Sequence, residues 1–347
     1  MRMIESCFTL PVTIDCQING AAGVDFNRTN YDLGQFEQAL RQVLQAGALF
    51  VLPTVISDEL PVLEDNLRHL DGLVECSALA QQMVLGYHLE GPLISPVDGY
   101  RGCHTVVSST QDFMGWFDGL QKALRRPVRI VTLAPEVAGA AELIRPLSAR
   151  GCVVAIGHSS ADAARIDDFQ ALGGSLATHL GNGLPPLLSK RENPLFELLI
   201  RPELHASIIA DGHHLSRSLL RLIVQAKGYD RLILVTDGTA ASAAPPGRYT
   251  LGQVNIFRSE SGVVRDDQTP GLAGSSATFV DLLHHFLQCV EPDLAQITAV
   301  SGMNACKLLN NAEISARVAG HEMTFERGAD AVRLVSLRRH GQIVALG

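Results

Sequence analysis

Five side chains suited to metal-dependent hydrolysis follow short apolar runs of the sequence: Glu90, His158, His179, His214 and Asp237. Two neutral imidazoles and one carboxylate leave a divalent ion with net positive charge and an open position for water. A nearby carboxylate that is not a ligand can act as general base on that water and then as general acid toward the leaving group. The set therefore predicts hydrolysis at a metal centre.

Each of these residues taken alone has an ordinary structural explanation. A histidine beside an apolar strand is often a hydrogen-bonded structural residue, and an aspartate at a strand end often caps a helix. Neighbouring glycines, including Gly181, Gly183 and Gly238, suit plain turns as readily as close approach to a ligand. The metal interpretation therefore depends on a fold that brings the five residues together.

Eight continuous apolar runs recur along the chain, and each is followed by a turn and a segment of helical character. Continuous rather than alternating apolar runs are typical of strands buried on both faces, as in a parallel sheet. The expected strands are Val12–Asp15, Ala48–Leu52, Met83–Tyr87, Val128–Thr132, Cys152–Ile156, Ser175–Thr178, Ala206–Ala210 and Leu232–Thr236.

The segments between these runs predict helices. Phe36, Leu40, Val43 and Leu44 fall on one helical face, and Ser159–Asp162 suits a helix N-cap. Eight such units in a row predict an α/β fold, a (β/α)8 TIM barrel, whose active site lies at the carboxyl ends of the strands. An open doubly wound sheet is the alternative.

The two chain ends have a different pattern. Ala331–Leu337 and Gln342–Leu346 predict a hairpin or small sheet, and Phe8–Leu10 is expected to add a strand beside it. We therefore expect a barrel over residues 11–310 and a small, reduced β-sheet subdomain made of residues 1–10 and 311–347.

Composition excludes several classes of function. The 347 residues are 46% hydrophobic and 18% charged, as in a compact globular enzyme. A net charge of -8 without a basic stripe argues against binding to nucleic acid, and no apolar run is long enough to span a membrane. Seven cysteines without a CxxC pair, and a start that is not a signal peptide, predict a cytoplasmic protein.

Eleven short stretches occur in a defined order between residues 11 and 310. They are Ile14–Gly20 with Gly23–Asn27, His88–Pro92, Gly102–His104, Val131–Glu136, Gly157–Ser159, Thr178–Leu180, Ile209–His214, Val235–Asp237, Gly247–Gly252 and Leu272–Ser275. In content and order they resemble the N-acetylglucosamine-6-phosphate deacetylase family of the amidohydrolase superfamily, and as a set they are highly specific.

The resemblance implies a role for each candidate residue. Glu90, His158 and His179 match the metal ligands, Asp237 matches the catalytic aspartate, and His214 matches the histidine that contacts the substrate carbonyl. The implied cofactor is one divalent metal ion. Imidazole and carboxylate ligands suit zinc, with iron, cobalt or manganese as alternatives.

The resemblance also implies how the substrate is held. His104, Arg191 and the backbone around Asn182 and Gly183 match positions that bind the phosphate of an amino-sugar phosphate. In the family some of these contacts cross a subunit interface, so a homodimer is expected.

Three features depart from the family pattern. Gln17 and Asn19 stand where many amidohydrolases carry two histidines for a second metal, and amides are poor zinc ligands, so we expect one metal. The family usually has an N-terminal segment that builds half of a small β-sandwich. Because this sequence begins almost at the first expected strand, we expect that sandwich to be reduced or rebuilt from the C-terminal strands. The departures on the substrate side are the loop Leu93–Arg101 and the glycines at positions 181, 183 and 238.

The predicted function is removal of acetate from N-acetylglucosamine 6-phosphate, giving glucosamine 6-phosphate. One alternative is a deacylase of a different N-acyl sugar phosphate or of an N-acyl amino acid. Another is a non-catalytic relative that binds sugar phosphate or metal, although such a relative would be expected to lose some of the five residues above.

Overall fold

The computed structural model describes residues 6–107, 112–268 and 271–344. Eight parallel strands form one sheet whose spatial order follows the order of the chain, as the apolar runs predicted. The strands are β2 (Ile14–Ile18), β5 (Phe50–Ile56), β6 (Tyr87–Glu90), β7 (Val128–Leu133), β8 (Val153–Ile156), β9 (Leu176–Ala177), β10 (His205–Ile208) and β11 (Leu232–Leu234).

The sheet closes into a barrel between its first and last strands, β2 and β11. The Asp237 N–H donates to the Gln17 carbonyl oxygen over 2.9 Å, and Ile18 pairs in parallel with Gly238. Deeper in the barrel, the Thr236 hydroxyl group donates to the Asp15 carboxylate over 2.5 Å. Because an open doubly wound sheet would leave its two edge strands apart, this closure rules out that alternative.

Three of the observed strands begin later and reach further than the sequence predicted. β5 continues to Ile56, and β6 begins at Tyr87, where the predicted strand ends. The reason is that polar side chains such as Gln17, Thr54 and Glu90 are buried inside the barrel at these strand ends. A strand defined by apolar residues alone therefore stops too early.

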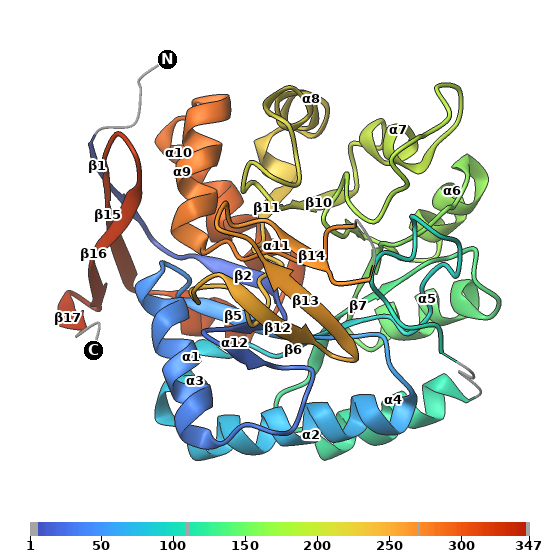
Figure 1. Cartoon of the computed structure of the whole chain (residues 1–347), viewed down its shortest axis with the longest axis horizontal. Coiled ribbons are helices and arrows are strands. Elements are labelled where there is room, and N and C mark those ends of the chain that lie inside the picture. The colour runs from blue at the N-terminus through green and yellow to red at the C-terminus, as the bar shows by residue number, and fades with distance from the viewer. Residues whose placement is uncertain (1–5, 108–111, 269–270, 345–347) are drawn as a thin grey trace.

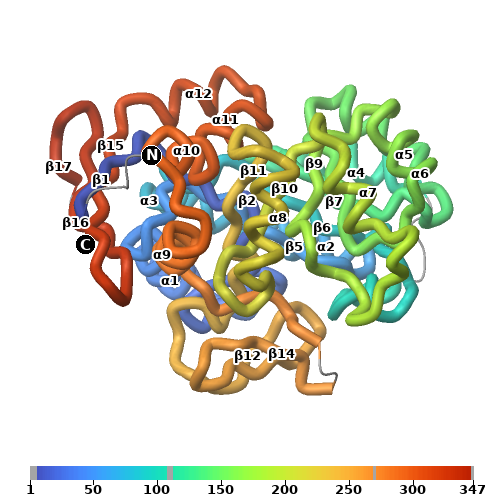
Figure 2. Tube along the Cα trace, turned by 90° about the horizontal axis from the view of Figure 1, so that it is seen from above, coloured from blue at the N-terminus to red at the C-terminus, as the bar shows by residue number. Residues whose placement is uncertain are grey.

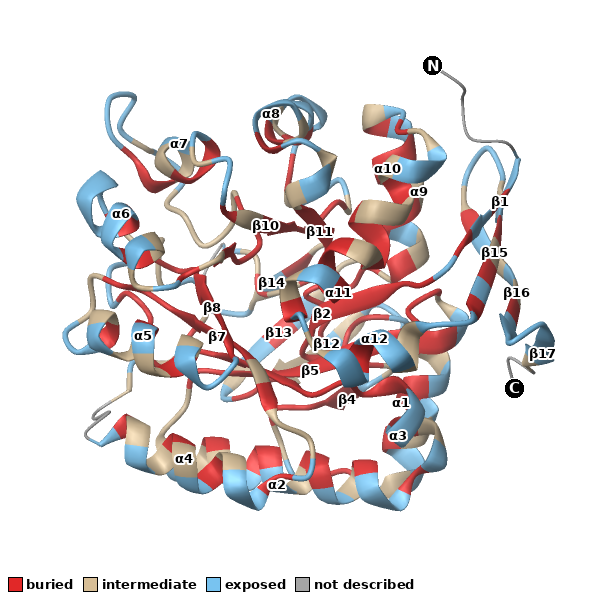
Figure 3. Ribbon diagram, turned by 180° about the vertical axis from the view of Figure 1, so that it is seen from behind, coloured by how far each residue is buried: buried red, intermediate tan, exposed pale blue. Residues whose placement is uncertain are grey.

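Helices form a ring around the strands and turn their apolar faces inward (Figure 1, Figure 3). In α1 the four predicted apolar residues are all buried, and α6 begins after the N-cap Asp162, within the predicted capping run. The helices that follow the first four strands are α1 (Leu33–Gln45), α2 (Leu60–Cys76), α3 (Ala78–Met83), α4 (Phe113–Ala123) and α5 (Ala140–Ala149).

In the second half of the ring, strands and helices continue to alternate until β11, after which several helices follow one another. The helices are α6 (Ala163–Ala171), α7 (Pro194–Leu199), α8 (Arg217–Lys227), α9 (Phe279–Val290), α10 (Leu294–Thr298), α11 (Asn304–Leu309) and α12 (Ala312–Val318), with single turns at Tyr229–Arg231 and Ala299–Met303.

Within the described residues, no helix combines the length and the apolar composition needed to cross a bilayer.

A four-stranded antiparallel sheet from both chain ends lies beside the barrel (Figure 1). The predicted hairpin is present as β16 (Val332–Arg339) and β17 (Gln342–Val344), while Ala345 and Leu346 lie outside the described residues. The strand β15 (His321–Arg327) was not predicted, and β1 (Cys7–Leu10) pairs with β15 rather than with the hairpin. The division of the chain at residues 10 and 310 stays a prediction.

A three-stranded sheet inserted between β11 and α9 was also not predicted. Its strands, β12 (Gly247–Leu251), β13 (Val254–Arg258) and β14 (Val264–Asp266), project from the barrel (Figure 2). Its buried face forms an apolar cluster with Ile56 at the end of β5, so the insertion builds a wall at the carboxyl ends of the strands. A short hairpin of β3 (Gly20–Ala21) and β4 (Val24–Asp25) follows β2.

Asp15 at the barrel closure makes the stability of the fold depend on pH. Burial raises the pKa of Asp15 from 3.8 to about 7, although its hydrogen bonds with Thr236 and Gln17 oppose the shift. The folded protein therefore binds the proton of the Asp15 carboxyl group more tightly than the unfolded chain does. The contribution of this proton to the free energy of unfolding is complete below pH 3.8 and is lost as the pH rises to about 7.

We expect Asp15→Asn to remove this dependence. The free energy of unfolding of the wild type, minus that of the variant, should fall by up to about 4 kcal/mol between about pH 4 and about pH 7. Urea unfolding at a series of pH values measures it, and a difference that stays constant with pH would contradict the assignment.

Candidate active site

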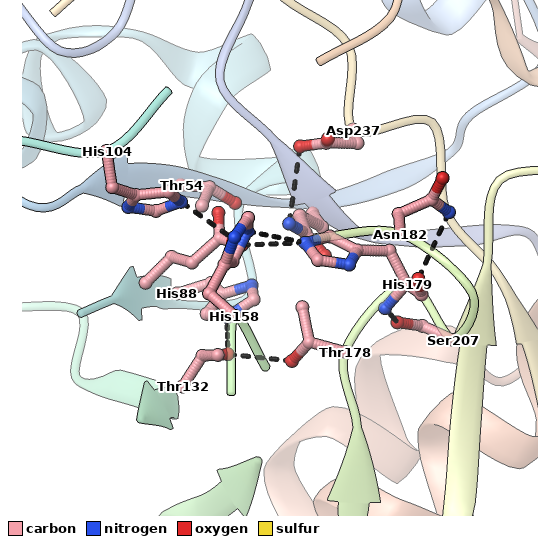
Figure 4. Close-up of polar contacts among 12 residues, drawn as sticks. Thr54, His88, His104, Thr132, His158, Thr178, His179, Asn182, Ser207 and Asp237 are labelled. Carbon is pink, nitrogen blue, oxygen red and sulfur yellow. Dashed lines mark hydrogen bonds and ion pairs between the residues drawn. The ribbon is translucent and has the colours of Figure 1, made fainter. Parts of the chain in front are cut away.

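Glu90, His158 and His179 converge from the carboxyl ends of β6, β8 and β9, and Figure 4 shows the two histidines side by side. Glu90 is the last residue of β6, and each histidine stands two residues after the end of β8 or β9. His179 Nε2 lies 3.0 Å from Glu90 Oε1 and 3.0 Å from His158 Nε2, and His158 Nε2 lies 3.3 Å from Glu90 Oε1. All three side chains are buried.

This arrangement fits a divalent metal ion. His158 Nδ1 lies 2.9 Å from the Tyr100 carbonyl oxygen, which only accepts, so Nδ1 carries the proton and Nε2 presents a lone pair to the cluster. Ligand atoms of a tetrahedral zinc ion stand roughly 3.3 Å apart, close to the spacing found here. Burial opposes ionisation of Glu90, but the neighbouring histidines hold its pKa well below the usual value.

His104 is a further imidazole beside this cluster. Its Nε2 lies 3.9 Å from Glu90 Oε1, and its Nδ1 lies 2.9 Å from Ser57 Oγ. Glu90, His104 and His158 also form a group whose ligand atoms lie within 4.8 Å of one another, so His104 is within reach of a metal at this place. The closer spacing favours His179 over His104 as the third ligand. Burial lowers the pKa of His104 to about 3, so this side chain is neutral.

Asp237, three residues after the end of β11, is buried above the same cluster (Figure 4). Its Oδ1 accepts hydrogen bonds from Asn19 Nδ2 over 2.7 Å and from Gln17 Nε2 over 3.2 Å, while Oδ2 has no partner among the described residues. Burial and the neighbouring Glu90 charge raise the pKa of Asp237 to about 7. The two amides that replace the histidine pair therefore orient a carboxylate that can exchange a proton near neutral pH.

Three of these residues share an uncommon backbone conformation. The φ angles are 49° at His158, 31° at His179 and 48° at Asp237, in the left-handed region that residues other than glycine rarely adopt. Such conformations cost free energy and gather at functional sites, where the surrounding structure holds them. Their presence after three separate strands supports a shared function for the cluster.

A cavity of about 650 Å³ opens over the cluster, a size typical of small-molecule sites. Glu90, His104, His158, His179, Asn182, Gly183, His214 and Asp237 all line it. One wall comes from the inserted three-stranded sheet through Leu251 and from the segment that ends at Gly274. Arg191 is exposed and is not among the lining residues, so a single chain does not bring it to the cavity.

The remaining substrate candidates lie on two other loops of the cavity. His214 Nδ1 donates to Asp211 Oδ2 over 2.8 Å, which leaves Nε2 for the cavity. Asn182 turns back on its own loop, because its backbone N–H donates to the His179 carbonyl oxygen over 2.9 Å. The Gly183 N–H has no hydrogen-bond partner within the described part of the chain, so it is available to an anion.

Sequence reasoning missed the residues that support the candidates. Ser57 and Asp211 hold His104 and His214, and the Tyr100 carbonyl oxygen holds His158. Asp98 and Arg101 line the cavity from the loop after β6. The departure of this loop from the family pattern was the signal available for Asp98 and Arg101, whereas a backbone carbonyl partner leaves no signal in a sequence.

Comparison with known proteins agrees with the geometry. The N-acetylglucosamine-6-phosphate deacetylase of Bos taurus is 32% identical over 347 residues, covering 95% of this chain and 80% of the relative. The chain belongs to the N-acetylglucosamine-6-phosphate deacetylase family. No protein-family model matches the sequence.

Two further proteins are similar to this chain, one in sequence and one in structure. The N-acetylgalactosamine-6-phosphate deacetylase of Shewanella sp. (strain ANA-3) is 32% identical over 267 residues, covering 76% of this chain and 64% of the relative. A mutant of the Mycobacterium smegmatis N-acetyl-D-glucosamine-6-phosphate deacetylase, in complex with N-acetyl-D-glucosamine-6-phosphate, superposes with a TM-score of 0.85 at 25% identity, covering 97% of this chain and 87% of that one.

The spacing of the cluster predicts which histidine the metal needs. We expect His179→Asn to weaken metal binding by more than about a hundredfold, since loss of a ligand should exceed the loss typical of an outer partner. The matched variant His104→Asn should keep the metal. Metal analysis after dialysis, with circular dichroism to check the fold, measures both, and loss of metal in a folded His104→Asn protein would make His104 a ligand.

Proposed function

We propose that the protein removes the acetyl group from N-acetylglucosamine 6-phosphate, giving acetate and glucosamine 6-phosphate. The observation that carries the proposal is the convergence of Glu90, His158, His179 and Asp237 on one cavity in a chain of this deacetylase family. Each of these side chains has a chemical task in amide hydrolysis, and all are buried where charges interact strongly.

Glu90, His158 and His179 would hold one divalent metal ion, which we propose to be zinc. When bound, the metal polarises the acetyl carbonyl and activates a water molecule. The Oδ2 atom of Asp237 takes a proton from the attacking water and returns a proton to the nitrogen as the C–N bond breaks. Asn19 and Gln17 hold the other oxygen of Asp237 throughout, so the carboxylate does not need to reorient.

We propose that His104 donates a hydrogen bond to the reacting carbonyl oxygen of the substrate, because His104 is the additional imidazole beside Glu90 and His158. A neutral His104 whose Nδ1 accepts a hydrogen bond from the Ser57 hydroxyl group presents an Nε2–H donor to developing negative charge. His214, held by Asp211, then contacts the substrate farther along the cavity wall. This reverses the roles that the resemblance implies for the two histidines.

The Asn182–Gly183 backbone is proposed to meet the sugar phosphate, through the free Gly183 N–H. A second substrate candidate is N-acetylgalactosamine 6-phosphate, and the similarity to the Shewanella N-acetylgalactosamine-6-phosphate deacetylase supports it. Rates of acetate release from the two epimers decide between them. A non-catalytic role is disfavoured because the proposed ligands and the proton-transfer residue are all in place.

We further propose a cytoplasmic homodimer. Seven free cysteines support a reducing compartment. Leu187, Phe196 and Ile200 are 88%, 44% and 69% exposed and bracket Arg191 along the chain. Large exposed apolar side chains of this kind suit an interface between subunits. Such an interface would carry Arg191 toward the cavity of the partner subunit.

The first test changes the residue that moves the proton. Asp237→Asn should lower the turnover number for N-acetylglucosamine 6-phosphate by about a hundredfold to ten-thousandfold, because general acid–base catalysis contributes that much. Bound metal should be unchanged, since Asp237 is outside the proposed ligand set. Acetate release and metal content measure the two effects, and turnover that survives with metal bound would remove Asp237 from its role.

The second test concerns the subunit interface. Leu187→Glu and Ile200→Glu should shift the protein toward monomer by at least about tenfold in dissociation constant, because each places a charge in the proposed apolar contact. Sedimentation velocity measures the shift. Leu294→Glu on α10, a residue 49% exposed, is the matched control and should leave the dimer intact. Equal behaviour of all three variants would exclude this surface as the interface.

A further inference from the structure

The substrate cavity contains one permanent positive charge within the described part of the chain. Among its lining residues, Arg101 is the only arginine or lysine, and Glu90, Asp98 and Asp237 are acidic. A sugar phosphate would enter this cavity as an anion and would need charge-assisted donors. We infer that Arg101 is the residue of this chain that binds the substrate phosphate, an inference that rests on the proposed function.

The backbone of Arg101 is held firmly beside the metal cluster. Its N–H donates to the Val97 carbonyl oxygen over 2.9 Å, and its own carbonyl oxygen accepts from the His104 N–H over 3.3 Å. The preceding residue, Tyr100, supplies the carbonyl oxygen that binds His158 Nδ1. The backbone of Arg101 is therefore fixed relative to His158, and a residue that binds the substrate phosphate needs such a fixed position.

The side chain of Arg101 keeps most of its donors free. Its Nη2 atom lies 2.8 Å from Asp98 Oδ1, and Asp98 is the only partner of the guanidinium among the described residues. The Asp98 side chain is 90% exposed and the Arg101 side chain is 35% exposed, so water screens this ion pair and it adds little stability. Nε and Nη1 remain available for phosphate oxygens in the paired geometry that arginine favours.

A second donor, the Gly183 N–H, lies on another loop that lines the cavity. A Cβ atom added to Gly102 would lie 3.0 Å from the His158 ring, and one added to Gly183 would lie 2.7 Å from it, so both glycines pack on this imidazole. The two loops also meet at Gly99, where an added Cβ would lie 2.6 Å from Pro185. Arg101 and the free Gly183 N–H thus belong to two loops that close around His158, and together they offer an anion site.

The test compares substrates with and without the phosphate. Arg101→Ala should lower kcat/KM for N-acetylglucosamine 6-phosphate by roughly tenfold to a hundredfold, mainly through KM. Activity on N-acetylglucosamine should change by less than about twofold, since that sugar carries no charge. Arg101→Lys should recover part of the loss, because a lysine keeps the charge without the paired donors. Calorimetry on the metal-loaded Arg101→Ala protein should show weaker binding of glucosamine 6-phosphate and unchanged binding of glucosamine.

Arg165→Ala is the matched control, because Arg165 pairs with Asp162 over 2.8 Å at the same spacing in the chain but lies outside the cavity. It should change neither substrate. The inference is overturned if Arg101→Ala affects both sugars equally or neither, or if only Arg191→Ala removes the preference for phosphate. If the wild type releases acetate from neither sugar yet binds glucosamine 6-phosphate through Arg101, the proposed function fails and the phosphate site stands.

Discussion

The contact between the ends of β2 and β11 is the constraint on which the site depends. The Asp237 N–H donates to the Gln17 carbonyl oxygen, and the side chains of Gln17 and Asn19 donate back to the Asp237 carboxylate. One seam thus closes the barrel and aims the carboxylate. Since a carboxylate oxygen only accepts hydrogen bonds, the amide nitrogen atoms must face it. The two positions that carry a histidine pair in many amidohydrolases thus hold amides that orient the Asp237 carboxylate, the group proposed to move the proton.

The cluster on the other side of the barrel has an electrostatic cost that a cation relieves. Glu90 Oε1 and the Nε2 atoms of His158 and His179 lie within 3.3 Å of one another in a buried place, and the Tyr100 carbonyl oxygen prevents His158 from donating at Nε2. Both histidines also hold left-handed backbone conformations. A fold tolerates such a concentration of lone pairs and strain where a bound metal offsets it.

The sequence predicted the parts of the molecule that repeat and missed those that do not. Eight apolar runs carry the parallel sheet, and the strand-end residues carry the site, because the carboxyl ends of barrel strands meet at one face. The strands β12, β13 and β15 alternate polar and apolar residues over short stretches and pack on distant elements. Strand pairing of this kind depends on tertiary contacts, which a single sequence does not reveal. Likewise, Tyr100 acts through its backbone and Arg101 through its place in a loop.

These differences divide the site into two layers with different tolerance to change. Glu90 ends β6, and His158, His179 and Asp237 stand two or three residues after the ends of β8, β9 and β11, so the barrel strands fix the positions of all four. The cavity wall is formed by the loop after β6, the loop after β9 and the inserted β12–β14 sheet. These loops and this insertion can change in sequence without disturbing the barrel. Substrate choice within the family can therefore change while the hydrolytic chemistry stays. In this chain the substrate-side departures from the family pattern are the loop Leu93–Arg101, Gly181 and Gly183 after β9, and Gly238 after β11, so we expect its discrimination among N-acetylated sugars to depend on these segments.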